Sequence, residues 1–397
     1  MSSATYRALL RTPGAAAFFL TATAGRMGIA MTGLALIWLV HDRTGSYAVA
    51  GLVTGCFAVA EALAGPQVAR VVDRFGQTRV LPGVLLAHTA AVASLLLLTT
   101  GGAPHGLLAA AGALAGGTIP QLGALSAARW SALLRDEREA LPTAFALESL
   151  ANGVCFLAGP PLVALVGVGI GPAYGSALAT ALVAGGGLAF AAQRRTAPAP
   201  AAASERRHAG RSLLRAGFAV QFGVNLGLGL YFGALQVSVT AFSVEHGAAG
   251  AAAPLYAASN CAGLLAGWLY GLRRWRGSPE TQLGLVTAGL AVACVPLPAV
   301  GTLPGMGIAL AVTGLAVPPV LVLSSVLTTA AVDRAALTQA FTWLNSASAA
   351  GSAGAAALAG GVVDAHGAQG GFAVAAAATS VMAVLASGRL YGARRRT

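Results

Sequence analysis

The chain has 397 residues, of which 56% are apolar and only 9% are Asp, Glu, Lys or Arg. Ordinary soluble domains contain about 25% charged residues. This chain, with a mean hydropathy of +0.75, has too few charges to cover a surface in water, so the composition excludes a water-soluble globule and predicts a protein embedded in lipid. The formal charge is +12, but the basic residues lie between apolar runs. They do not form the basic, aromatic-lined patch of a nucleic-acid binder, and we expect no nucleic-acid partner.

Twelve long apolar stretches follow one another along the chain and predict an all-α integral membrane protein. About 20 apolar residues in a helix span the hydrocarbon core of a bilayer, and membrane helices tolerate the abundant Gly and Pro. The first stretch is too long for a cleaved signal peptide and is not followed by an A-x-A site, so we expect it to be retained. The predicted spans are 14–39, 46–70, 80–100, 104–128, 142–167, 170–192, 215–242, 250–272, 280–300, 303–330, 336–363 and 370–391.

The distribution of arginine predicts the orientation, because short cytoplasmic loops collect positive charge. Arginines gather at both termini and in every second loop, whereas the loops between them carry Arg43 alone. We therefore expect both termini to be cytoplasmic. All 24 basic residues are Arg, which indicates a GC-rich bacterial genome and hence a bacterial cytoplasmic membrane. The cytoplasmic groups are Arg7 and Arg11; Arg70, Arg74 and Arg79; Arg129, Arg135 and Arg138; Arg194, Arg195, Arg206, Arg207, Arg211 and Arg215; Arg273, Arg274 and Arg276; Arg334; and Arg389, Arg394, Arg395 and Arg396.

A polar segment rich in Pro, Ala and Arg, residues 193–214, predicts a cytoplasmic linker between two six-span halves, residues 1–192 and 215–397. The halves share two short patterns at corresponding spans. Parallel six-helix repeats around a central cavity are an architecture of secondary transporters. The pattern R-x-A-L-x-x-A-F occurs at 138–145 and 334–341, and Ala64-Gly65 with Ala69 and Arg74 is echoed by Ala266-Gly267 with Gly271 and Arg276.

The loop after the second predicted span resembles a loop pattern of the major facilitator superfamily, G-x-L-x-D-R-x-G-R-R. Asp73, Arg74 and Gly76 match in place, Ala69 replaces the first Gly, and Arg79 lies just beyond the basic pair. The resemblance implies twelve transmembrane helices in two pseudo-symmetric halves around a central cavity. It also implies a cytoplasmic gate in which Asp73 caps a neighbouring helix end and helps to hold the outward-facing state. Simple positive-inside topology is the alternative explanation for these charges.

The fifth predicted span resembles the Gly-Pro-rich helix five of drug exporters in that superfamily. It carries Gly153, Gly159 and Pro160, although the longer glycine pattern is incomplete. The fourth span departs from the exporters, because residues 116–121 read GGTIPQ and contain no Arg. On the helix-five pattern, export is favoured over import.

Three ionisable residues lie inside predicted spans: Arg26, Glu61 and Glu148. A charge within the membrane is costly unless it is paired or hydrated, so each marks a candidate functional site. We hypothesise that Glu61, together with Glu148, exchanges a proton and changes its pairing with Arg26 as the cavity switches sides. Arg26 and Glu61 lie on consecutive antiparallel helices, which suggests that they pair. The alternative is a permanent ion pair that locks the helices together.

By the same resemblance, the first, fourth, seventh and tenth spans line the central cavity. Span seven is the richest in polar and aromatic side chains, with Gln221, Asn225, Phe232 and Gln236 on one broad face. Hydrogen bonds between helices are the alternative role of these amides. Adjacent prolines at 318–319 should break or kink span ten. The other candidate cavity residues are Thr32, Trp38, Thr118, Gln121 and Ser324.

These features predict a secondary active transporter that exports small amphipathic compounds by alternating access, coupled to protons. The alternative is an uptake or facilitative carrier for a small metabolite, without proton coupling. A mostly apolar lining suits a lipophilic solute better than a sugar, whose hydroxyls need many partners. We expect no enzyme activity, because the His residues are scattered, and no metal or other cofactor, because the four Cys residues lack ligand spacing. A non-transporting receptor would be expected to carry a soluble domain. We expect a monomer in contact with membrane lipid.

Overall fold

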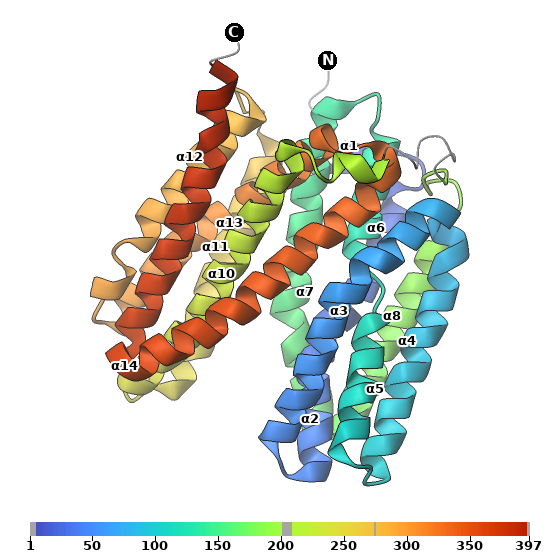
Figure 1. Cartoon of the computed structure of the whole chain (residues 1–397), viewed down its shortest axis with the longest axis vertical. Coiled ribbons are helices and arrows are strands. Elements are labelled where there is room, and N and C mark those ends of the chain that lie inside the picture. Colours follow the sequence, from blue (N-terminus) through green and yellow to red (C-terminus); the bar gives the residue numbers. More distant parts are fainter. Residues whose placement is uncertain (1–4, 201–208, 274, 395–397) are drawn as a thin grey trace.

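The computed structural model describes residues 5–200, 209–273 and 275–394. These residues form helices and connecting turns without a β-strand (Figure 1). Part of the predicted linker, residues 201–208, lies outside the described residues, and so do Arg274, Arg395 and Arg396 of the predicted cytoplasmic groups.

Two groups of helices follow each other along the chain. Local sequence sets several of their ends: Ser46 and Thr302 accept hydrogen bonds from backbone N–H groups as N-caps, and Gly45 ends a helix with φ at 65°. The N-terminal group comprises α1 (Tyr6–Arg11), α2 (Ala15–Thr44), α3 (Tyr47–Phe75), α4 (Gln77–Thr100), α5 (His105–Gly117), α6 (Leu122–Leu133), η1 (Arg138–Ala140), α7 (Leu141–Gly169) and α8 (Pro172–Ala192). The C-terminal group comprises α10 (Ala216–Glu245), η2 (Ala249–Ala251), α11 (Ala252–Leu272), α12 (Pro279–Cys294), η3 (Leu297–Ala299), α13 (Leu303–Ala331), η4 (Arg334–Ala336) and α14 (Leu337–Arg394).

The predicted multi-pass membrane protein is confirmed. Within the described residues, 10 helices are long and apolar enough to cross a membrane. Two features make this number consistent with the twelve predicted spans. The helix α14 bends at Gly367, whose φ of 70° and ψ of −176° separate two arms. The 21-residue helix α11 is long enough to span but less apolar than the ten.

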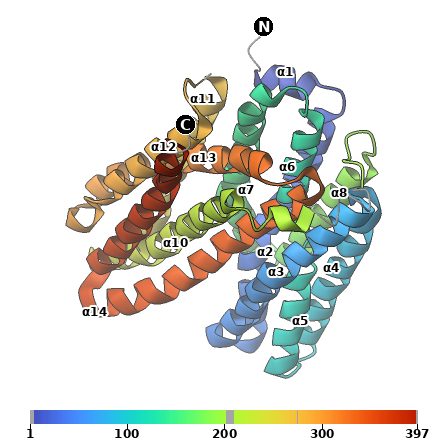
Figure 2. The ribbon, with the colours of Figure 1, turned by 45° about the horizontal axis from the view of Figure 1, so that its top comes forward.

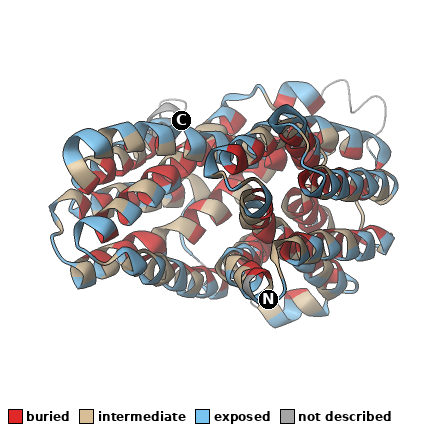
Figure 3. Cartoon of the chain, turned by 90° about the horizontal axis from the view of Figure 1, so that it is seen from below, coloured by how far each residue is buried: buried red, intermediate tan, exposed pale blue. Residues whose placement is uncertain are grey.

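Both termini lie at the same end of the molecule, which we call the termini face (Figure 1). The two groups contact each other toward this face and diverge toward the opposite face, as a tilted view also shows (Figure 2). Buried positions line the helix contacts, and exposed positions cover the outer surface (Figure 3). The exposed side chains include many large apolar ones, such as Leu86, Leu97 and Val384, as expected for a surface that meets lipid.

Both groups contain a closely packed glycine at an equivalent position. The two glycines are 199 positions apart in the sequence, and so are the residues that they contact. A Cβ added to Gly28 would lie 2.8 Å from Val183, and a Cβ added to Gly227 would lie 2.9 Å from Met382. In each case the first long helix of a group, α2 or α10, packs tightly on its last helical segment, α8 or the second arm of α14. The repeat makes the two groups pseudo-symmetric and aligns Arg26 of α2 with Asn225 of α10.

Prolines 318–319 do not break span ten, because α13 runs without interruption from Leu303 to Ala331, and the alternative, a kink, stays a prediction. Pro318 packs against the α11 glycines Gly263 and Gly267, and neighbouring helices can stabilise proline within a membrane helix. A break occurs instead in the fourth span, which the sequence analysis expected to be continuous. There α5 ends at Gly117 and α6 begins at Leu122.

Candidate functional site

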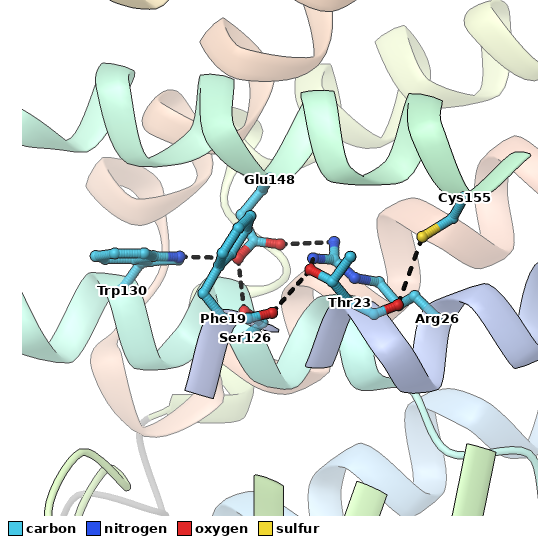
Figure 4. Close-up of polar contacts among 7 residues, drawn as sticks. All are labelled: Phe19, Thr23, Arg26, Ser126, Trp130, Glu148 and Cys155. Atoms are coloured by element: carbon cyan, nitrogen blue, oxygen red, sulfur yellow. Dashed lines mark hydrogen bonds and ion pairs between the residues drawn. The ribbon is translucent and has the colours of Figure 1, made fainter. Parts of the chain in front are cut away.

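A buried polar cluster joins three helices inside the N-terminal group (Figure 4). The guanidinium of Arg26 on α2 lies 2.6 Å from Glu148 Oε2 on α7. The other carboxylate oxygen, Oε1, accepts hydrogen bonds from Ser126 Oγ at 2.6 Å and from Trp130 Nε1 at 2.8 Å, both on α6. Arg26 also donates to Thr23 Oγ1 at 3.3 Å. Both charges are buried and neutralise each other, which a low-dielectric interior requires.

Helix periodicity explains how this cluster forms. Ser126 and Trp130 are four residues apart on α6 and therefore project from one face, which lies against Glu148. The expected pairing of Arg26 with Glu61 is wrong, because Arg26 pairs with Glu148. Consecutive helices need not turn their charged faces toward each other, and the face of α3 that carries Glu61 meets Gln121.

Glu61 has a neutral partner. Its Oε1 accepts a hydrogen bond from Gln121 Nε2 at 3.3 Å, and it forms no ion pair with any described residue. Gln121 is the residue immediately before α6, at the break in the fourth span. One turn after Glu61, Gly65 lies close to both groups: a Cβ there would be 3.2 Å from Thr342 Cγ2 and 3.5 Å from Gln121 Nε2. Glu61 therefore lies close to the contact between α3 and α14.

The predicted gate motif lies at the end of α3 and contacts the start of α14. Asp73 Oδ2 accepts a hydrogen bond from the backbone N–H of Gln339 at 3.0 Å. With its amide oxygen turned toward Arg70, Gln339 also accepts from Arg70 Nε at 3.3 Å and Nη2 at 3.1 Å. A carboxylate that receives a first-turn N–H stabilises a helix start. Arg70 and Asp73, one turn apart on α3, thus both contact Gln339 in the first turn of α14.

The other gate-motif residues have separate positions. Ala69 is buried and faces the protein interior, Gly76 has a φ of 92° between α3 and α4, and Arg79 is exposed. The guanidinium of Arg74 lies 4.9 Å above the Phe75 ring.

The predicted cavity residues have different surroundings. Asn225 donates to Ser324 Oγ at 2.7 Å, which joins α10 to α13, and Gln221 is buried with an Oε1 that has no described partner. Phe232 and Gln236 are exposed on α10. Thr32 and Thr118 donate to carbonyls of their own helices, those of Gly28 and Leu114, whereas Trp38 of α2 packs against Gly167 of α7.

The helix-five residues serve as contact points of α7. A Cβ on Gly153 would lie 2.8 Å from Leu264 of α11, and one on Gly159 would lie 3.1 Å from Ala30 of α2. Pro160 is accommodated inside α7. This stretch therefore lets α7 approach helices of both groups.

Three contacting residues were not among the predicted site residues: Ser126 and Trp130, which bind Glu148, and Gln339, which binds Asp73. The i, i+4 spacing of Ser126 and Trp130, at the end of the fourth apolar span, was the available signal. Arg129 was expected in a cytoplasmic loop after the fourth span, but it lies inside α6, where it is fully buried and donates to Gln77 Oε1 at 2.8 Å and to Thr196 Oγ1 at 3.1 Å. Within the described residues, no three His, Cys, Asp or Glu side chains lie close enough to hold a metal ion.

Comparisons with known proteins identify similar sequences and folds. The family model described as Major Facilitator Superfamily matches residues 18–312, and a search of curated proteins found no significant match. The human organic anion transporter MFSD10 (TETRAN) has a similar structure, with a TM-score of 0.73, 16% identity and coverage of 94% of this chain and 98% of that chain.

Two further similar structures are transporters described as outward. A bacterial homologue of the iron transporter ferroportin, in an outward-facing state, has a TM-score of 0.71 at 12% identity. FucP, described as a Major Facilitator Superfamily transporter in the outward conformation, has a TM-score of 0.67 at 14% identity. Both alignments cover 94% of this chain and 98% of the other. At such identities the likeness concerns the fold.

Proposed function

This chain belongs to the Major Facilitator Superfamily, and from that premise we propose that it exports small amphipathic compounds by proton-coupled antiport. Members of the superfamily are transporters, so transport follows from membership. The direction, the coupling ion and the substrate class are our proposals. The two halves, residues 1–192 and 215–397, move relative to each other about the linker 193–214.

The hydrogen-bond partners of the two carboxylates within the spans, Glu61 and Glu148, support proton coupling at Glu61. Glu148 receives a guanidinium, an indole N–H and a hydroxyl, and protonating it would break a buried ion pair. Among the described residues, Glu61 receives a hydrogen bond only from the amide of Gln121. An amide can donate to a carboxylate and accept from a carboxylic acid, so Gln121 suits both protonation states. Glu61 is therefore the proton carrier, and Glu148 with Arg26 is a fixed structural pair.

The position of Glu61 supports a link between its protonation and movement of the halves. It lies beside the break between α5 and α6 and one turn from Gly65, which approaches Thr342 of α14. Discontinuous helices supply binding sites for coupling ions in secondary transporters. A change of charge at Glu61 therefore acts where the two groups meet.

The arginine distribution supports a cytoplasmic termini face. With that orientation the contacts between the groups, including Asp73 with Gln339, close the cytoplasmic side, and the protein is in an outward-facing state. Exposed Phe232 and Gln236 on α10 supply the aromatic and amide groups that an amphipathic solute needs. The protein works as a monomer in a bacterial cytoplasmic membrane.

Transport by purified protein in liposomes tests this function. With an internal pH dye and a panel of lipophilic cations, anions and neutral metabolites, a substrate of the wild type should move protons in the opposite direction. Glu61→Gln should abolish that proton movement, and the exposed control Glu137→Gln should not. Solute flux without proton movement in the wild type would overturn the antiport proposal and favour a facilitative or uptake carrier. Proton movement that persists in Glu61→Gln would overturn the assignment of the carboxylate.

A further inference from the structure

The short helix α1 precedes the first span, yet its tyrosine contacts the other group of helices. The single O–H of Tyr6 donates a hydrogen bond shared between the backbone carbonyls of Gly267 at 3.2 Å and Trp268 at 3.0 Å, both on α11. Each carbonyl oxygen has two lone pairs, so it can accept from Tyr6 and still keep its helical bond. The N-terminal segment thereby bridges the two groups at the termini face.

A glycine makes room for this contact. A Cβ on Gly271 of α11 would overlap Tyr6 Oη and would lie 2.6 Å from the Cβ of Ala146 on α7. The carbonyl of Gly271 also accepts a hydrogen bond from Thr143 Oγ1 at 3.1 Å. Three elements, α1, α7 and α11, therefore meet at one residue without a side chain, and two of them belong to the opposite group.

The internal sequence repeat allows the junction that contains Tyr6 to be compared with the equivalent junction of the other group. Gly271 corresponds to Ala69 in the repeated pattern, and the junction of α11 with α7 is the pseudo-symmetric counterpart of the junction of α3 with α14. In the latter, Asp73 provides one of the hydrogen bonds between the groups. The position that corresponds to Asp73 holds Trp275, which stacks on Tyr270 at 5.2 Å and donates to the Tyr270 carbonyl. Trp275 thus interacts within its own group, and the hydrogen bonds between the groups here come from Tyr6 and from Thr143.

We propose that Tyr6 is a latch that holds the two groups together at the termini face and thereby sets the balance between the two states of the transport cycle. In alternating access the halves separate at whichever face opens. The bonds from Tyr6 to α11 exist only while the termini face is closed. An interaction made in one state alone shifts the population toward that state. Tyr6 is a positioning residue, since it acts without touching Glu61. This proposal rests on alternating access and does not depend on the direction of transport or on proton coupling.

Distance measurements between spin labels test the latch in full-length protein in lipid nanodiscs. Asp136→Cys with Arg276→Cys places labels on both groups at the termini face, in a background without the four native cysteines. Loss of a hydrogen bond of ordinary net strength shifts an equilibrium about fivefold. Tyr6→Phe, which keeps the ring, should therefore raise the ratio of open to closed termini face about fivefold. The exposed control Tyr174→Phe should leave the ratio unchanged.

A second variant changes the α11 side of the contact between Tyr6 and α11. Gly271→Ala displaces both Tyr6 and α7 and should open the termini face further than Tyr6→Phe does. The control Gly289→Ala, on α12 where a Cβ meets open space, should have no effect. A purely structural role for Tyr6 would lower thermal stability but leave the label distances unchanged. That result in Tyr6→Phe would overturn the proposal.

Discussion

Phe145 and Phe341 meet across the two groups of helices, with ring centroids 5.8 Å apart and planes inclined at 57°. They are the last residues of the two copies of R-x-A-L-x-x-A-F, one at the start of α7 and the other at the start of α14. The internal repeat therefore places equivalent aromatic rings on opposite sides of the same contact. Both rings are buried, so the contact contributes to closure of the termini face.

A double-mutant cycle measures the coupling between these rings. We expect Phe145→Ala and Phe341→Ala each to destabilise the protein, and we expect the double variant to lose less than the sum. A tilted aromatic pair adds about 0.5–1.5 kcal/mol beyond its buried area, which is the coupling energy expected. Unfolding in mild detergent provides the measurement. Strict additivity would show that the rings do not interact in the membrane protein.

The pair Arg26–Glu148 is predicted to be structural. Removing one charge leaves the other buried without a partner, which costs about 3–5 kcal/mol. Glu148→Gln and Arg26→Met should each lower stability strongly, and the double variant should recover part of the loss. Unfolding midpoints, compared with the exposed pair Arg135–Asp136 as a control, check this. A double variant that is less stable than either single variant would contradict a simple ion pair.

Arg129 is predicted to fix the beginning of the linker to the N-terminal group. Its guanidinium donates to the carbonyls of Phe190 and Gln193, both at 3.1 Å, and lies 3.7 Å above the Phe190 ring. Arg129→Leu leaves these carbonyls without their donor. Limited trypsin digestion should then cleave after Arg194 and Arg195 faster than in the wild type. Equal cleavage rates would show that the linker is held by other contacts.

High pH should weaken the Tyr6 latch. Burial raises the pKa of Tyr6 from 10.0 to about 12, so the folded protein favours the neutral phenol. The stabilisation from this shift is fully present below pH 10 and is lost as the pH rises through about 12. The label distances at the termini face should therefore lengthen above pH 11 in the wild type beyond any change in Tyr6→Phe. Identical pH profiles in both proteins would contradict the prediction.

Structural features that depend on one continuous stretch of sequence could be predicted. The apolar stretches gave the membrane spans, and the pattern from Ala69 to Arg79 led to the superfamily, which the family comparison confirms. The 3.6-residue periodicity limits which residues share a helix face. It does not determine how far each helix is rotated against its neighbours, and for that reason Arg26 was paired with the wrong carboxylate.

The break in the fourth span and the intact α13 show a second limit. Proline was expected to interrupt α13, yet two glycines of α11 give Pro318 space. In the fourth span, Pro120 follows Thr118 and Ile119, and the helical hydrogen bonding ends there. Whether a proline interrupts a membrane helix depends on its neighbours, and these are set by the tertiary fold. The contact of Tyr6 with α11 likewise joins residues more than 260 positions apart, and no local pattern indicates it.

The most direct test of proton coupling at Glu61 compares solute exchange with proton-driven transport in the same liposomes. Glu61→Gln should retain exchange of substrate across the membrane, because alternating access and the cavity remain. It should lose accumulation driven by a pH gradient, because residue 61 then has no titratable proton. Accumulation by Glu61→Gln at the wild-type level under the same gradient would contradict the account.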